Sequence, residues 1–202
     1  MTLSLADIAA FNVVLAAAIA APGAALLYFL KITVASGHAA GIATGVGLGT
    51  AAALWTLAAL LGLEVVFTLF PWTYTALKVG GALYLIWIGV QTWRQASVPL
   101  GEAPSAKGTA ILSGLLVNLG NPKSMLFAAA VIVVVFPQGL TAPDIALIVI
   151  NHWLLELAFY SLFAVVLSTG GARRGYVRLK PFWDRLAACL LGALGLRLML
   201  EK

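Results

Sequence analysis

The chain has 202 residues, of which 62% are hydrophobic and 9% are charged. A soluble globular domain carries about 25% charged residues, so this composition argues strongly against a soluble enzyme or a nucleic-acid-binding protein. The net charge of +5 is typical of a polytopic membrane protein whose basic loops hold it in one orientation. The single cysteine, Cys189, allows no intrachain disulfide and no thiolate metal cluster, and we expect neither a metal nor a cofactor.

Six apolar segments are long enough to cross a bilayer, because a spanning helix needs about 20 residues. Connectors that contain Pro, Gly and charged residues separate them. The first segment has no basic residue before it, so we expect a retained helix and not a cleaved signal peptide. We therefore expect one all-α polytopic transmembrane domain over residues 1–202. The expected spans are Asp7–Leu30, Ala39–Phe67, Tyr74–Thr92, Thr109–Phe136, Ile145–Ser168 and Phe182–Leu200.

Six spans place both termini on one side of the membrane, and the basic residues indicate which side. Most of them lie in or beside the first, third and fifth connectors. The positive-inside rule assigns these connectors to the cytoplasm and both termini to the opposite side. The residues that set this bias are Lys31, Arg94, Lys107, Arg173, Arg174, Arg178, Lys180 and Arg185, against Lys78, Arg197 and Lys202 on the other face.

The two halves of the chain, about 1–95 and 107–202, share features that indicate an internal repeat. Residues 81–85 read Gly-Ala-Leu-Tyr-Leu, and residues 192–196 read Gly-Ala-Leu-Gly-Leu. The first and fourth segments are each interrupted at a proline, as Pro22-Gly23 and as Asn121-Pro122-Lys123. Three spans in each half give the halves opposite orientations. Interrupted helices at corresponding places in inverted repeats are typical of a transporter's binding site.

The break at Pro122 falls near the middle of its segment. The stretches before and after it have 13 and 14 residues, about 20 Å each as helix, and neither alone crosses a hydrocarbon core of about 30 Å. We therefore expect a kinked or broken helix at mid-depth. A plain proline kink without a functional role is the alternative.

Three ionisable residues fall deep inside the expected spans. Lys123 follows the proline, and Glu156 is central in the fifth segment, one helical turn after His152. A buried carboxyl favours its neutral form, so a proton-coupled polar site made of these three residues is one interpretation. A static buried ion pair between Lys123 and Glu156 is the other. Asn118 and Asn121 either bond between helices or line a cavity.

Three classes of function remain open from the residues alone. Interrupted helices favour a secondary transporter with its substrate between the halves, near Pro22-Gly23 and Asn121-Pro122-Lys123. An intramembrane enzyme would use His152 and Glu156 as acid–base partners on a lipid substrate. A scaffold subunit that does not transport would use its small-residue faces to bind a partner. The first class is preferred, and we expect no enzymatic activity.

A set of motifs extends over nearly the whole chain. They are Pro22-Gly23, the glycines 37, 41, 45 and 49, Lys78-Val79-Gly80-Gly81-Ala82-Leu83-Tyr84-Leu85 with Gly89, Gly114, Asn118, Asn121-Pro122-Lys123, Phe127 and Pro137-Gln138. With these motifs the sequence resembles the lysine exporter (LysE/RhtB) family of amino-acid exporters. The resemblance implies a bacterial inner-membrane protein surrounded by lipid, so the side to which the positive-inside rule assigns both termini is the periplasm. It also implies export of amino acids or related small zwitterions, proton exchange and a homodimer. At Ala24-Ala25 the sequence departs from the family's usual Pro-Gly-Pro motif.

Overall fold

The computed structural model describes residues 3–21, 23–70, 72–97, 109–167 and 170–200. These residues form eight α-helices and no strand, which confirms the all-α prediction. The helices are α1 (Leu5–Ala20), α2 (Ala24–Ser36), α3 (His38–Leu69), α4 (Trp72–Gln95), α5 (Ala110–Leu119), α6 (Pro122–Val135), α7 (Ala142–Leu167) and α8 (Gly170–Leu200).

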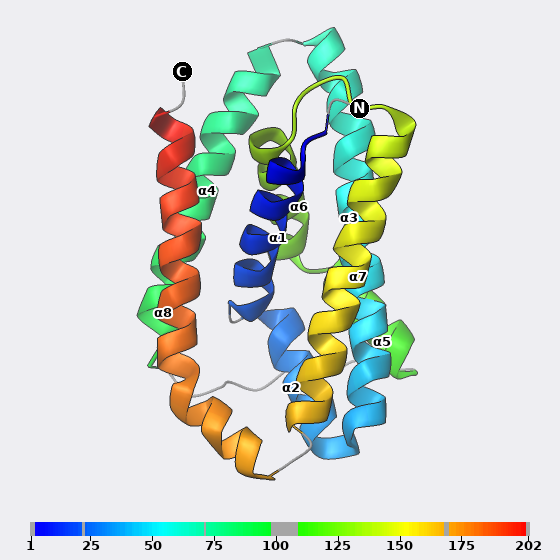
Figure 1. Cartoon of the computed structure of the whole chain (residues 1–202), viewed down its shortest axis with the longest axis vertical. Helices are drawn as coiled ribbons and strands as arrows, with labels where there is room; N and C mark the ends of the chain where they lie inside the picture. Colours follow the sequence, from blue (N-terminus) through cyan, green and yellow to red (C-terminus); the bar gives the residue numbers. More distant parts are fainter. Residues whose placement is uncertain (1–2, 22, 71, 98–108, 168–169, 201–202) are drawn as a thin grey trace.

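The helices run along one long axis in alternating directions (Figure 1). In that view α1 and α2 descend together, α3 ascends and α4 descends. The second half has the opposite directions, because α5 and α6 ascend together, α7 descends and α8 ascends. Helix α1 therefore begins, and helix α8 ends, at the same end of the molecule.

Two of the described helices are long and apolar enough to cross a membrane singly. These spans are His38–Gly62 within α3 and Ala142–Leu167, which is α7. The pair α1 and α2 passes the same test when taken together, as does the pair α5 and α6, and each pair bends by 63° at its break. The described residues thus contain two to four candidate membrane spans, and the chain is a multi-pass membrane protein.

Two of the connectors expected between spans are largely helical: the one after Leu30 and the one before Phe182. The predicted ends of the first and sixth spans at these positions are therefore wrong. Helix α2 continues through Lys31 and ends at Ser36, and its C-cap residue is Gly37, whose φ of +86° suits glycine. Helix α8 already begins at Gly170 and includes most of the basic stretch before Phe182. Pro181 lies inside α8, which changes direction in its N-terminal part (Figure 1). Lys and Arg are good helix formers, so the composition of this stretch favours a helix.

Glycines let α3 lie very close to two other helices. A Cβ atom built at Gly47 would overlap the backbone of α5 at Ile111, and one at Gly114 would overlap the backbone of α3 at Thr44. On another face of α3, a Cβ at Gly45 would overlap the Cβ of Tyr160 in α7. Small residues let helix backbones approach closely in membranes. These contacts hold α5 and α7 against α3 and so fix the site described next.

Candidate functional site

The breaks of the two bent pairs provide many of the residues around one central cavity. Helix α1 ends at Ala20 and α2 begins after Gly23, while α5 ends at Leu119 and α6 begins at Pro122. Pro22, which the sequence predicts to be part of the site, lies outside the described residues. The hydrogen-bonding groups that helix ends leave unpaired are therefore concentrated at the depth of the two breaks.

The start of α6 is capped by its own residues. The side-chain oxygen of Asn121 accepts a hydrogen bond of 3.1 Å from the backbone N–H of Lys123. Pro122 has no N–H to satisfy, and the N–H of Ser124 donates to the Asn121 carbonyl at 3.1 Å. The first amide groups of α6 are thus occupied, and the role of Asn121 here is to cap the helix.

The start of α2 differs, since none of the described side chains caps it. Its N-cap residue is Gly23, which has extended backbone and makes no side-chain hydrogen bond to the helix. Gly23, Ala25 and Leu26 line the central cavity. The first amides of a helix together carry a partial positive charge that favours an anion. The two breaks are therefore chemically unequal. The first amide groups of α2 are more accessible to an anion in the cavity than those of α6.

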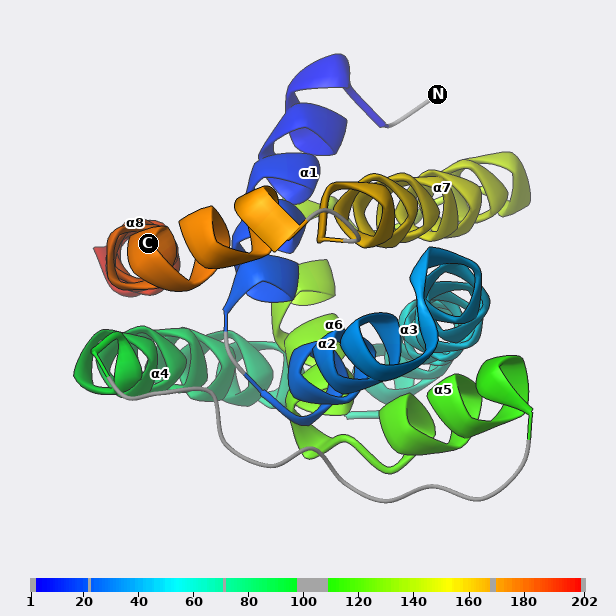
Figure 2. The same ribbon diagram turned by 90° about the horizontal axis from the view of Figure 1, so that it is seen from below.

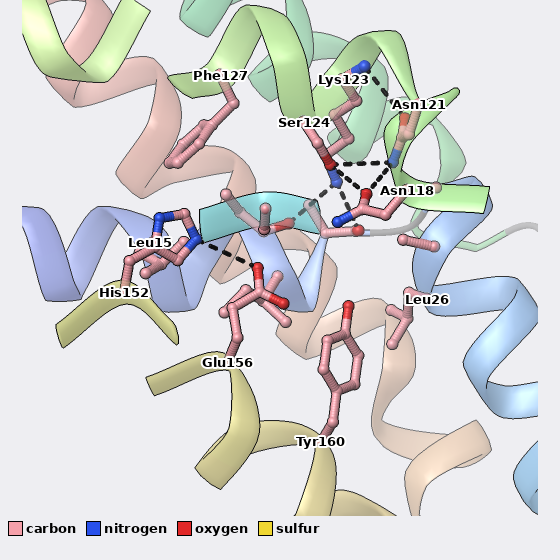
Figure 3. Close-up of a pocket in the computed structure, with 16 residues that line it drawn as sticks. Leu15, Leu26, Asn118, Asn121, Lys123, Ser124, Phe127, His152, Glu156 and Tyr160 are labelled. Atoms are coloured by element: carbon pink, nitrogen blue, oxygen red, sulfur yellow. Dashed lines mark hydrogen bonds and ion pairs between the residues drawn. The ribbon is translucent and has the colours of Figure 1, made fainter. Parts of the chain in front are cut away.

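Lys123 joins the second break to the first. Its Nζ donates hydrogen bonds to the carbonyl oxygens of Ala18 (3.0 Å) and Ala21 (2.8 Å) at the C-terminal end of α1. Its side chain passes over Gly23, where a Cβ would lie 3.3 Å from the lysine Cδ. A cation near the last carbonyls of a helix is stabilising. Figure 3 shows the ammonium reaching down to these carbonyls from α6.

Glu156 and His152 form the acidic side of the cavity on α7. Both are buried, and Glu156 Oε1 lies 3.5 Å from His152 Nε2 without the geometry of a hydrogen bond. The other ring nitrogen, Nδ1, lies 2.7 Å from the Thr56 hydroxyl on α3. The second carboxyl oxygen, Glu156 Oε2, has no hydrogen-bond partner among the described residues.

A direct ion pair between Lys123 and Glu156, one of the two interpretations that the sequence left open, is not formed among the described residues, because the lysine bonds to α1 and the carboxyl faces His152. Both side chains nevertheless line the same cavity. Since a buried charge without a hydrogen-bonding partner is costly, the free oxygen of Glu156 is a position where a proton or a cationic group would be stabilised.

Asn118 ties α5 to α3. Its amide donates to the Leu48 carbonyl at 2.7 Å, and its side-chain oxygen accepts from the amide of Asn121 (3.2 Å) and from the hydroxyl of Ser124. Because the amide and the oxygen are both engaged within the protein, Asn118 braces the second break while it also lines the cavity. The sequence left open whether it bonds between helices or faces a cavity, and it does both.

The cavity is small and mixed in character. Its volume is about 40 Å³, which is room for about three water molecules at about 15 Å³ each on this measure. Figure 3 shows Glu156 and Tyr160 rising from α7 toward the side on which Asn118, Asn121 and Lys123 lie. The lining residues are Leu15, Ala18, Ile19, Ala21, Gly23, Ala25, Leu26, Ala52, Asn118, Asn121, Lys123, Ser124, Phe127, His152, Glu156 and Tyr160.

Sequence reasoning missed two polar residues of this site. Ser124 bonds to both asparagines and lines the cavity, and its place directly after Lys123 was the available signal. Thr56 contacts His152 from another helix, and nothing in the sequence marks it. Of the predicted residues, the described side chains of Asn118, Asn121, Lys123, His152 and Glu156 meet around the cavity together with Gly23.

Comparison with known proteins assigns this architecture to a family. The family model described as LysE type translocator matches residues 16–202. The threonine efflux protein of Escherichia coli K12 is 30% identical over 196 residues, covering 92% of this chain and 93% of that protein. The homoserine/homoserine lactone efflux protein of Salmonella typhimurium LT2 is 32% identical over 121 residues, covering 58% of this chain and 56% of that protein. No solved structure matches the chain.

A multi-pass helical protein with a polar cavity between two broken helices has the organisation of a membrane transporter. The chain belongs to the LysE family of translocators. It is a transporter and not an enzyme, so the alternative of an intramembrane enzyme acting through His152 and Glu156 is set aside.

Proposed function

We propose that this protein exports small zwitterionic amino acids of the threonine and homoserine kind from the cell in exchange for protons. The names of the relatives support this substrate class. The observation that carries the coupling is the buried carboxyl of Glu156, whose Oε2 has no hydrogen-bond partner among the described residues and which lines a cavity beside both helix breaks.

In this proposal residues 1–202 form one transmembrane domain of six spans, made of two inverted halves at about 1–95 and 107–202. The alternating helix directions and the equal 63° bends of the two broken pairs support the repeat (Figure 1). The protein lies in the bacterial inner membrane with both termini periplasmic. Arg94 lies in the last turn of α4, and further basic residues lie in the first part of α8. They support a cytoplasmic location for the end of the molecule where α4 ends and α8 begins.

The substrate would bind as a dipole between the halves. Its ammonium group would contact Glu156, and its carboxylate would face the uncapped start of α2 at Gly23, with Lys123 beside it. Asn118 and Asn121 would hold the second break in position through their hydrogen bonds. An amino acid is larger than the present cavity of about 40 Å³, so binding requires the halves to separate, as in transporters that rock around a central site.

One carboxylate would serve both the proton and the substrate. When Glu156 is charged it stabilises the substrate's ammonium, and when it is protonated that attraction is lost. Because the two ligands exclude each other at the same oxygen atoms, binding of a proton from the outside releases the substrate there. His152, whose Nε2 lies 3.5 Å from Glu156 Oε1, would hold the carboxyl in place. When Glu156 is protonated, this ring nitrogen would accept a hydrogen bond from the carboxyl group.

The test is transport by purified protein in proteoliposomes, with labelled threonine or homoserine and a pH gradient. We expect Glu156→Gln to lose proton-driven flux, because the amide cannot titrate, and Glu156→Asp to keep part of it. Asp7→Asn changes a half-buried carboxyl in the first turn of α1, outside the lining of the cavity, and serves as the matched control with full flux. Proton-driven flux through Glu156→Gln equal to that of the Asp7→Asn control would refute the coupling role.

The homodimer implied by the family resemblance is part of the proposal. Its measurement is the mass of the detergent-solubilised protein by light scattering, and a monomer at all concentrations would remove it. This outcome leaves the transport proposal unaffected, since the cavity described above is built from one chain.

A further inference from the structure

A second hollow lies between α4 and α8, and none of its residues lines the central cavity. The two helices lie side by side (Figures 1 and 2). They approach closely at Gly89, where a Cβ would lie 2.9 Å from the Ala188 carbonyl oxygen. We call this hollow the α4–α8 groove. Its volume is about 270 Å³, and it is lined by Ile86, Gly89, Val90, Trp93, Arg94, Ala188, Cys189 and Gly192.

The groove has unoccupied space beside Gly192. A Cβ atom built there meets nothing within 4 Å, and the neighbouring side chains of Val90, Trp93 and Cys189 are exposed. Apart from Arg94, the described residues that line the groove are uncharged. An apolar hollow left empty in a membrane loses dispersion contacts, so a hydrocarbon chain is the kind of group that fits it.

The charges beside the groove are basic. Arg94 lines it, and the guanidinium of Arg185 lies 5.6 Å from the centre of the Trp93 ring, within the range of a cation–π contact. Trp93 thus holds a second arginine beside the end of the groove that Arg94 occupies. Guanidinium groups match the geometry of phosphate oxygens, and basic pockets between membrane helices bind anionic lipid headgroups.

We propose that the α4–α8 groove is a binding site for an anionic phospholipid. One acyl chain lies against Gly89 and Gly192, and the phosphate is held by Arg94 and Arg185. The charge complementarity of the two arginines is the reason to assign a lipid headgroup here and not a second copy of this chain. The inference stands apart from the transport mechanism, because the groove and the central cavity share no residue.

Cys189 provides the readout, since it lines the groove, is exposed and is the one cysteine of the sequence. The experiment measures the alkylation rate of Cys189 by N-ethylmaleimide in detergent, with added dioleoyl phosphatidylglycerol or dioleoyl phosphatidylcholine. We expect phosphatidylglycerol to protect the thiol at about 25-fold lower concentration, because two arginines each favour an anionic lipid by about fivefold. In Arg94→Gln/Arg185→Gln this preference disappears. Arg178→Gln, another exposed basic residue of α8, is the charge control and keeps it.

A second measurement counts phosphatidylglycerol retained by the unlabelled protein in native mass spectrometry. We expect Gly192→Phe to lose the bound lipid by filling the groove, and Gly80→Phe to retain it, since a Cβ at Gly80 also meets nothing within 4 Å but lies outside the groove. Equal protection by both lipids would overturn the proposal, because the site would not select the headgroup. Protection that needs no lipid, rises with protein concentration and comes with Cys189–Cys189 cross-links would also overturn it, in favour of a second copy.

Discussion

Gly49→Ala tests whether the position of Glu156, and not only its charge, matters for transport. A Cβ at Gly49 would lie 3.0 Å from the Glu156 Cβ, whereas ordinary contact begins at 3.4 Å, so the glutamate must move by about 0.4 Å. If a displacement of 1 Å costs about 100-fold in rate at a positioned site, then 0.4 Å costs about sixfold. We therefore expect flux to fall about sixfold.

The stability of Gly49→Ala should change little. Alanine is favoured over glycine in a helix interior by about 0.8–1.0 kcal/mol, which offsets the cost of a small overlap. Gly62→Ala, in the same helix with nothing within 4 Å of its Cβ, is the control and should keep full flux. Gly45→Ala, whose Cβ overlaps that of Tyr160, should lose both stability and flux. The assays are thermal unfolding in detergent and proteoliposome flux. Equal flux from Gly49→Ala and Gly62→Ala would refute the reasoning.

Two further substitutions test the surroundings of two lysines, Lys123 and Lys180. Lys123→Met removes two hydrogen bonds to carbonyl oxygens of α1, worth about 1–3 kcal/mol each, but it also removes the cost of burying a charge, about 3 kcal/mol. We expect the free energy of unfolding, measured by chemical unfolding, to fall by about 1 kcal/mol and the flux to fall strongly. Unchanged flux would contradict the role of Lys123. Asp184→Asn breaks the buried pair with Lys180 at 2.7 Å and should cost about 3–5 kcal/mol, with partial recovery in Lys180→Met/Asp184→Asn; a variant as heat-stable as the wild type would count against it.

The two halves of the cavity have different roles in this structure. The second break is closed by its own residues, since Asn121 caps α6 and Asn118 anchors α5 to α3. The first break depends on the second, because Lys123 bonds to α1. Movement of one half of the chain against the other would therefore strain or release the two hydrogen bonds from Lys123 Nζ to the carbonyl oxygens of Ala18 and Ala21. If the halves separate as proposed, Lys123 would couple opening of the cavity to the position of α1 through these hydrogen bonds.

The sequence by itself determined the class of the protein and the places of its polar residues along the apolar segments. Apolar segment length fixed an all-helical membrane protein. Pro122 marked the second break because proline lacks an N–H and clashes with the preceding turn. The positions of Lys123 and Glu156 within long apolar segments indicated the site, and the i, i+4 spacing predicted that His152 lies beside Glu156, which the 3.5 Å distance confirms.

Only the tertiary structure decided what these groups contact. Lys123 meets carbonyls about a hundred residues earlier in the chain, and Thr56 meets His152 from another helix. No local pattern encodes such partners, since they arise where glycines such as Gly49 let two helices approach. The sequence also left the two breaks equivalent. Their difference, one capped by Asn121 and the other open at Gly23, depends on backbone geometry and on which side chains the packing brings within hydrogen-bonding distance.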